Sequence, residues 1–238
     1  PSWAFALLVL WAGATSTWEY CNICYGDVHK TGVWVSSAIG AAIIAVMYWF
    51  GAFTLAALCI AALLVFLFFL FNYKDQSQAS RLINASITGI VYGSVLMGSL
   101  ALLHRDATSS GPFWILLLLC IVWIGDTGAY FSGRAFGKHK LYEAVSPNKS
   151  IEGAVGGFLI SVSAAVGLNF WFPSLSGSYE VFGSLDLTLS WEQLTIGQIL
   201  LVAIPANLLG QTGDLAESLI KRAHGVKDSG TIIYGHGG

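Results

Sequence analysis

The stretch from Asn207 to Gly238 combines side chains that could hold a metal ion and phosphate groups. It reads NLLGQTGDLAESLIKRAHGVKDSGTIIYGHGG, and its polar residues continue directly out of an apolar run. Membrane helices rarely carry such groups without a functional reason. Asn207, Gly210, Asp214, Ser218 and Lys221 follow each other at intervals of three or four, so they share one face of a helix. That face presents an acid (Asp214), a hydroxyl (Ser218) and a base (Lys221), with Glu217 and Arg222 beside it.

The residues after this helical stretch are rich in glycine. Lys227 and Asp228 come first, then Gly230, and then the run Gly235, His236, Gly237 and Gly238. Glycine lets the backbone approach a ligand closely, and successive N–H groups can then point at anionic oxygens. The stretch as a whole therefore favours the chemistry of phosphates and a divalent metal.

A second polar cluster lies further upstream, in WIGDTGAYFSGRAFGKHK. It places Asp126, Tyr130 and Arg134 at intervals of four, on one face of a helix. Placing a carboxylate at the centre of a membrane span costs roughly 2.5 to 3.5 kcal/mol on insertion scales, and less near the membrane interface. We therefore expect another group to interact with Asp126 and offset this cost.

The segment 137–150, GKHKLYEAVSPNKS, is the most basic part of the chain. Pro147 and Asn148 are typical turn residues, and they predict a turn that presents Lys149. Alone, this segment could be an anchor for anionic headgroups. Likewise, Asp126 could pair with Arg134 or cap a helix, and Asp214 could only form an ion pair with Lys221 or another basic residue.

The composition is that of a polytopic membrane protein. The 238 residues are 55% hydrophobic and only 10% charged, with a mean hydropathy of +0.70. Since about 20 apolar residues make one span, we predict an all-α transmembrane bundle. Its seven spans lie near 3–18, 33–50, 52–71, 83–103, 113–133, 152–172 and 197–217. We expect 1–238 to form a single membrane domain, with the active-site region at 122–152 and 207–238.

Cysteine and glycine have simpler interpretations. The four cysteines give no disulfide framework, and Cys21 and Cys24 form a lone CxxC. We predict free thiols in a loop rather than a zinc site. Gly153, Gly156 and Gly157 are interpreted as helix-packing positions.

The positive charges predict an orientation, because Lys and Arg near helix ends concentrate on the cytoplasmic side. Seven spans place only Arg105 in one set of loops. The other ten basic residues fall in the opposite set: Lys30, Lys74, Arg81, Arg134, Lys138, Lys140, Lys149, Lys221, Arg222 and Lys227. We therefore predict that the loops at 134–151 and 218–238 are cytoplasmic and that the loop at 173–195 is on the outer face.

The pattern S-x-x-K-R-x4-K-D-x5-Y-G-H-G-G, from Ser218 to Gly238, resembles the long signature of the phosphatidate cytidylyltransferases, or CDP-diacylglycerol synthases. The segments IGDTGAYFSGRAFGKHK and SPNKSIEG are also similar to that family, as is Trp18-Glu19-Tyr20. Tyr234 replaces the usual proline, and the chain stops before the family's D-R-x-D segment. The resemblance thus implies a fragment lacking both termini of a protein with about nine helices.

The resemblance implies that CTP and phosphatidate give CDP-diacylglycerol and diphosphate at a bacterial-type inner membrane, with the site facing the cytoplasm. Asp214 is the leading Mg²⁺ ligand, with Asp228 and then Asp126 as weaker candidates. A second, monovalent or divalent cation is left open. The resemblance implies that the other site residues bind phosphates or orient substrate: Lys221, Arg222, Lys227, Lys149, Arg134, Asn148, Ser218, His236 and Gly237.

The expected partners are CTP, phosphatidic acid and the lipid bilayer. No nucleic acid is expected, and a homodimer is left open. Two other functions stay open: a membrane transporter of a phosphorylated metabolite, and a CTP-dependent lipid or polyprenol kinase. A transporter would place polar residues near the bilayer midplane, often on broken helices in matching halves. Here the acids instead fall at the predicted inner ends of two spans.

Overall fold

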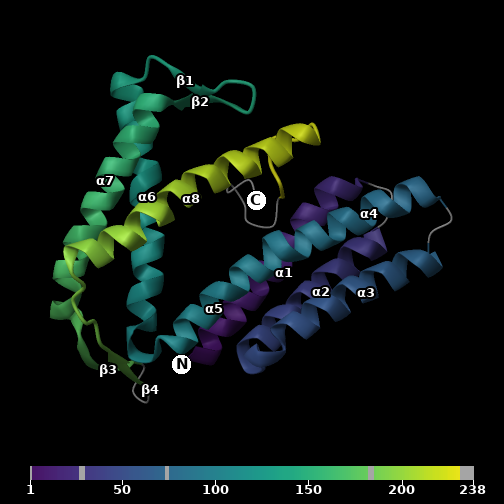
Figure 1. The fold of residues 1–238 in the computed structure, drawn as a ribbon, viewed down its shortest axis with the longest axis horizontal. Coiled ribbons are helices and arrows are strands. Elements are labelled where there is room, and N and C mark those ends of the chain that lie inside the picture. The colour runs from purple at the N-terminus through teal and green to yellow at the C-terminus, as the bar shows by residue number, and fades with distance from the viewer. Residues whose placement is uncertain (1, 27–29, 73–74, 182–184, 231–238) are drawn as a thin grey trace. The chain divides into compact units, whose positions relative to one another are not determined.

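The structure is a computed structural model that describes residues 2–26, 30–72, 75–181 and 185–230 (Figure 1). The chain divides into two compact units. The first comprises Pro1–Arg105 and His224–Gly238, and the second comprises Asp106–Ala223. The expectation of a single domain stays a prediction.

The first unit is built from long helices that pack through an apolar core. They are α1 (Ser2–Tyr25), α2 (Lys30–Trp49), α3 (Thr54–Asn72), α4 (Gln76–Gly89) and α5 (Leu96–Asp106), with a 3-10 turn at Gly51–Phe53. Asp75 caps α4, because its side chain accepts from the backbone N–H groups of Ser77 and Gln78. Phe69, Val33, Val65 and Tyr25 are buried in the core between these helices.

A π-helical stretch, Ile90–Val95, joins α4 to α5, so that the chain from Gln76 to Asp106 is continuously helical. Gly93 lies against α1, where an added Cβ would come within 2.6 Å of the Thr17 nitrogen. The Thr17 hydroxyl donates to the Gly89 carbonyl oxygen, at 3.1 Å. A side chain from α1 thus bonds a carbonyl at the start of the irregular stretch.

The second unit contains three long helices and two short hairpins. The helices are α6 (Gly111–Phe136), α7 (Ile151–Trp171) and α8 (Ile196–Ala223). Strands β1 (Lys140–Tyr142) and β2 (Ser146–Ser150) form one antiparallel hairpin, and β3 (Gly177–Val181) and β4 (Leu185–Leu189) form the other. Short 3-10 turns occur at Thr108–Ser110 and Phe172–Leu175.

The apolar core of the second unit lies toward the β3–β4 end of its helices. The rings of Phe113, Phe172 and Trp191 pack there in tilted and edge-on arrangements, with centroids 4.8 to 5.9 Å apart. Asn169 in α7 is fully buried, and its side chain forms hydrogen bonds with the segment that follows β4. Its side chain accepts from the Trp191 indole and from the Leu194 N–H, and donates to the Leu194 carbonyl oxygen.

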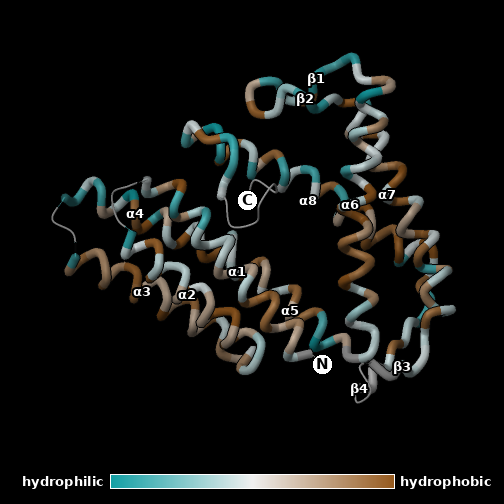
Figure 2. The backbone as a smooth tube through the Cα atoms, turned by 180° about the vertical axis from the view of Figure 1, so that it is seen from behind, coloured by the Kyte–Doolittle hydropathy of each residue, from teal (hydrophilic) through white to brown (hydrophobic). Residues whose placement is uncertain are grey.

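The all-α membrane bundle predicted from the sequence is confirmed. Six helical stretches among the described residues are long and apolar enough to cross a membrane: Lys30–Trp49, Gly51–Asn72, Gln76–Asp106, Gly111–Phe136, Ile151–Leu175 and Ile196–Ala223. Figure 2 shows the apolar character along α3 and α6, in brown, and the more hydrophilic hairpin β1–β2, which is mostly teal and white. Leu55, Leu70 and Phe71 on α3 are exposed, as lipid-facing side chains are.

The region expected as the first span differs from the prediction. Helix α1 extends to Tyr25, and it is not among the six helices apolar enough to span. The prediction that Cys21 and Cys24 lie in a loop is wrong: both thiols are free, but both are buried in α1. The last turns of α1 pack on α4, where an added Cβ at Gly89 would come within 2.9 Å of Cys21 Sγ. This packing explains why α1 continues.

Candidate active site

Small residues bring α6 and α7 together beside the site. A Cβ added at Gly157 would lie 2.5 Å from the Gly125 carbonyl oxygen, and one at Gly153 would lie 2.8 Å from the Ala129 carbonyl oxygen. A Cβ at Gly156 would collide with the Ser132 side chain. The interpretation of the three α7 glycines as helix-packing positions is confirmed.

The hairpin β1–β2 connects the ends of α6 and α7 (Figure 1). The predicted turn at Pro147 and Asn148 is wrong, because both residues lie in β2 and the turn falls at 143–145. A two-stranded hairpin consists of edge strands, where proline is tolerated if its missing N–H faces away from the partner strand. The Ser150 hydroxyl then caps α7 by accepting from the Gly153 N–H, at 3.1 Å.

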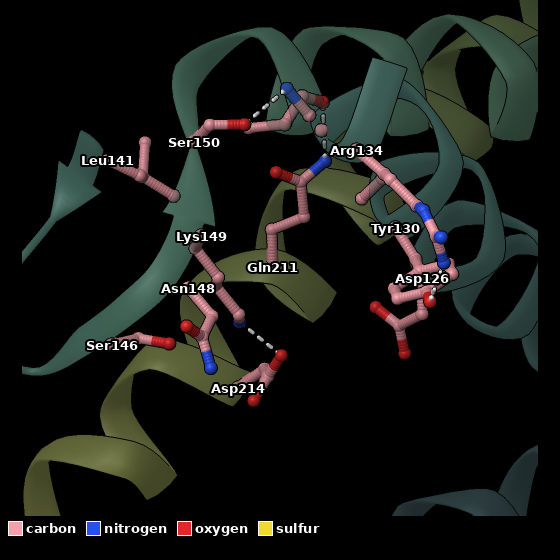
Figure 3. A pocket seen from close by; sticks show the side chains of 14 residues that line it. Asp126, Tyr130, Arg134, Leu141, Ser146, Asn148, Lys149, Ser150, Gln211 and Asp214 are labelled. Atoms are coloured by element: carbon pink, nitrogen blue, oxygen red, sulfur yellow. Dashed lines mark hydrogen bonds and ion pairs between the residues drawn. The ribbon is translucent and has the colours of Figure 1, made fainter. Parts of the chain in front are cut away.

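A cavity of about 620 Å³ lies between α6, the hairpin, α7 and α8. Figure 3 shows side chains from these elements converging on it. The lining comprises Asp126, Ala129, Tyr130, Gly133, Arg134, Leu141, Ser146, Asn148, Lys149, Ser150, Gly153, Ala154, Gln211 and Asp214. Two acids, two bases and several amide and hydroxyl groups therefore share a space large enough for a substrate.

Lys149 on β2 and Asp214 on α8 form an ion pair in this cavity (Figure 3). Their side chains are 31% and 44% exposed, so both groups remain accessible from the cavity. An ion pair between Asp214 and Lys221, one of the alternatives drawn from the sequence, is not what the structure has. Lys221 instead donates to the Glu217 carboxylate one turn earlier on α8, at 2.8 Å.

Asp126, Tyr130 and Arg134 lie on one face of α6, as the spacing predicts, and all three line the cavity. The Arg134 guanidinium donates to the Tyr130 hydroxyl, at 3.2 Å. Within the part of the chain that the structure describes, the Asp126 carboxylate makes no hydrogen bond or salt bridge. The alternative in which Asp126 pairs with Arg134 is therefore wrong, and the carboxylate is available to a ligand.

The structure brings together five of the predicted site residues: Asp126, Arg134, Asn148, Lys149 and Asp214. Asp126, Lys149 and Asp214 therefore line one cavity, and all three come from the segments 122–152 and 207–238 in which the active-site region was expected. Ser218, Lys221 and Arg222 lie on the last turns of α8, and they are not among the described residues that line the cavity.

The remaining predicted site residues belong to the other unit or are not described. Lys227 and Asp228 are exposed residues of the first unit. His236 and Gly237 lie outside the described residues. The roles of these four residues stay predictions.

Gln211 also lines the cavity, although it was not among the predicted site residues. Its amide donates to the Asn207 side-chain oxygen, at 2.7 Å, and to the Ala154 carbonyl oxygen of α7, at 3.1 Å. A signal for it exists, because Gln211 lies four residues after Asn207 and three before Asp214, which places it on the same polar face of the helix.

The cavity has the donor set that a magnesium ion uses. No cluster of three or more His, Cys, Asp or Glu side chains that could hold a metal occurs in the described ranges. Mg²⁺, however, is commonly held by one or two carboxylates together with substrate phosphates and water. Asp126 and Asp214 supply two carboxylates to one cavity, so the residues present fit that pattern.

Comparison with known proteins decides the family. The model of the family described as the cytidylyltransferase family matches residues 1–238. The chain belongs to the cytidylyltransferase family. This finding confirms the resemblance seen in the signature and in the two upstream segments.

Curated relatives match about half of the chain. The phosphatidate cytidylyltransferase of Staphylococcus haemolyticus (strain JCSC1435) is 43% identical over 130 residues, which are 55% of this chain and 43% of the relative. The phosphatidate cytidylyltransferase of Staphylococcus aureus (strain COL) is 40% identical over 133 residues, 56% of this chain and 44% of the relative. The matched part thus spans less than half of each relative.

Proposed function

We propose that this member of the cytidylyltransferase family transfers the cytidylyl group of CTP to phosphatidate, giving CDP-diacylglycerol and diphosphate. The observation that carries the proposal is the convergence of Lys149, Asp214 and Asp126 on one cavity in a chain matched throughout by that family. The names of the relatives supply the substrate class, since both are phosphatidate cytidylyltransferases.

In the proposed reaction, an oxygen of the lipid phosphate attacks the α-phosphorus of CTP, and the bond to the β-phosphate breaks to release diphosphate. Both reactants are polyanions, so positioning and charge neutralisation do most of the work. Lys149 binds phosphate oxygens, and Arg134 offers further donors from the α6 wall. Asn148 and Gln211 orient the substrate by hydrogen bonding.

Asp214 and Asp126 would hold Mg²⁺, with Asp214 as the leading ligand. When bound, the ion supplies positive charge to the phosphates of CTP. Asp214 already faces a cationic partner, so metal and phosphate would compete with or replace its ion pair to Lys149. We assign Asp228 a weaker role as a metal ligand, and we leave a second cation open.

The rest of the signature would complete the substrate site. We propose that Lys221, Arg222 and Lys227 bind phosphate oxygens and that Ser218, His236 and Gly237 orient substrate. The support for these roles is the resemblance of the stretch to the family signature. A homodimer is compatible with this proposal and is not required by it.

The setting of the reaction is the bilayer. The six apolar helices make the chain a multi-pass membrane protein, and phosphatidate would enter from the lipid phase. We propose that the cavity faces the cytoplasm at an inner membrane, where CTP is available. The support is the bias in basic residues: ten Lys and Arg residues fall in the loops of one side, and only Arg105 falls in the loops of the other.

The test is a turnover assay with the full-length protein in detergent. CTP labelled in the cytosine ring should pass its label to phosphatidate, and diphosphate should form in equal amount. Lys149→Met, which keeps length but removes charge, should lower turnover by about 100-fold or more. Formation of CDP together with a phosphorylated lipid would indicate a kinase instead. Absence of any CTP-dependent product would refute the proposal.

A further inference from the structure

Glu152, in the first turn of α7, closes the base of the β1–β2 hairpin. Its Oε2 accepts from the backbone N–H groups of Lys138 and His139, at 3.1 and 3.2 Å. Its Oε1 lies 2.6 Å from His139 Nδ1. One carboxylate thus bonds three groups in the residues that lead from α6 into β1.

The same junction carries a backbone bond in the opposite direction. The Ile151 N–H donates to the His139 carbonyl oxygen, at 2.9 Å. The residues that enter the hairpin are therefore bonded to the start of α7 in two ways, through the Ile151 N–H and through the Glu152 carboxylate. Only the carboxylate also bonds Lys138.

This junction lies next to the residue that crosses the cavity. Lys149 precedes Glu152 by three residues in the same strand-to-helix connection, and its side chain reaches Asp214 on α8. A two-stranded hairpin is marginally stable by itself. The direction from which Lys149 enters the cavity therefore depends on how the hairpin is attached.

We propose that Glu152 is a positioning residue that fastens the β1–β2 hairpin to α7 and thereby places Lys149 against Asp214. The significance of Lys149 for catalysis rests on the proposed function, but its placement does not. Glu152 touches neither Lys149 nor the cavity, so it acts through the hairpin.

A simpler reading is that Glu152 only complements the helix dipole, as acids in a first turn do. That role needs a charge near the N-terminus and no particular partner. Here both carboxylate oxygens are used, and besides the N–H of Glu152 itself their partners belong to the hairpin entry, at Lys138 and His139. The two readings differ in what happens to Lys149 when the carboxylate is removed.

The experiment measures the reactivity of the Lys149 amine in the full-length protein, using a small amine-acylating reagent and mass spectrometry. Glu152→Ala removes all three bonds, and we expect Lys149 to be acylated about tenfold faster. Glu152→Gln keeps one acceptor oxygen and should give an intermediate rate. Lys221, which is paired with Glu217 on α8, serves as the internal reference and should not change.

Glu143→Ala is the matched control. Glu143 lies in the turn of the same hairpin, is exposed, and makes no hydrogen bond or ion pair to any described residue. It should leave the Lys149 rate unaltered. Hydrogen exchange provides a second measurement, because the amides of Lys138 and His139 should exchange faster in both Glu152 variants and not in this control.

Unchanged acylation of Lys149 in Glu152→Ala would overturn the inference. An equal rise at Lys149 and Lys221 would also overturn it, because it would show general destabilisation. Neither readout needs turnover. A faster Lys149 in a protein that does not convert CTP and phosphatidate would therefore support the positioning role while refuting the proposed function.

Discussion

Lys149 and Asp214 are 65 residues apart in the sequence and form an ion pair inside one cavity. The lysine comes from a short strand and the aspartate from a long helix, so the pair joins the hairpin to α8. An isolated, half-exposed pair contributes little to stability. Its position in a cavity that Asp126 also lines is better explained by ligand binding than by folding.

Asp214→Asn keeps the size of the side chain and some of its hydrogen bonding, but removes the charge that a hard cation requires. We expect the full-length variant to fold and to lose about 100-fold or more of its CTP turnover. Added Mg²⁺ should restore little. Turnover per folded molecule is the measurement, with Glu143→Gln as the control for loss of one carboxylate.

An Asp214→Asn variant that is less stable but nearly as active would remove Asp214 from the site. The ion pair with Lys149 would then be structural only.

Variants of the Lys221–Glu217 pair can distinguish two roles of Lys221, an ion pair with Glu217 and the binding of substrate phosphate. The pair lies on one helix at a spacing of four residues, and such pairs contribute about 0.3 to 0.5 kcal/mol. We therefore expect Glu217→Gln to change Tm little and to leave turnover within about twofold. Lys221→Met should lower turnover at least about tenfold, if the lysine binds phosphate. Equal, small effects of the two changes would assign Lys221 to the surface pair alone.

The spans were predictable because their signal is local. A run such as TLAALCIAALLVFLFFLFN in α3 is apolar on every side, and only a membrane accommodates that pattern when so many of its side chains are exposed. The polar face of α8 was predictable for the same reason, since helical spacing alone aligns Asn207 with Asp214. Local periodicity therefore identified both acids of the cavity.

The partner of Asp214 was not predictable, because it depends on a long-range contact. The sequence left that partner as Lys221 or another basic residue, and helical spacing does not identify Lys149, which lies on a different element. The hairpin also lacked a clear signal. Its strands are short and polar, and Pro147 with Asn148 has the chemistry of a turn, although an edge strand tolerates both. The prediction that Cys21 and Cys24 lie in a loop also failed because of a long-range contact. Packing on α4 extends α1 past its apolar run.

The close approach of α6 and α7 can be tested with two substitutions on α7. Gly157→Ala would place a methyl group 2.5 Å from the Gly125 carbonyl oxygen. The helices must then separate, at a cost of about 1 to 3 kcal/mol, and the site walls would move with them. We expect a Tm lower by several degrees and reduced turnover.

Gly167→Ala is the matched control, since nothing lies within 4 Å of a Cβ there. It should be neutral, or stabilising by up to about 1 kcal/mol. Equal effects at positions 157 and 167 would contradict the tight packing of α6 on α7.

Asn169 should matter for stability and not for chemistry. Asn169→Ala removes its bonds to the Trp191 indole and to both backbone groups of Leu194. Leaving buried polar groups without partners should cost about 2 to 4 kcal/mol. Thermal unfolding in detergent measures the loss, and turnover per folded molecule should be preserved. Gln193→Ala, at an exposed position of the same loop, is the control that should leave Tm unaltered.

The orientation of the chain is the last prediction, and it concerns the two hairpins of the second unit. If the bias in basic residues sets the topology, β1–β2 is cytoplasmic and β3–β4 lies outside. Glu143→Cys in the first hairpin and Ser178→Cys in the second are exposed reporter positions. Each would be introduced into a full-length protein whose native cysteines are replaced.

In intact cells, a thiol reagent that does not cross the membrane should label position 178 and leave position 143 unlabelled. After the cells are opened, both positions should react, which shows that position 143 was protected by the membrane and not by the fold. Labelling of position 143 from outside would place the cavity on the face opposite to CTP. The proposed cytoplasmic site would then be wrong, whatever the roles of Lys149 and Asp214.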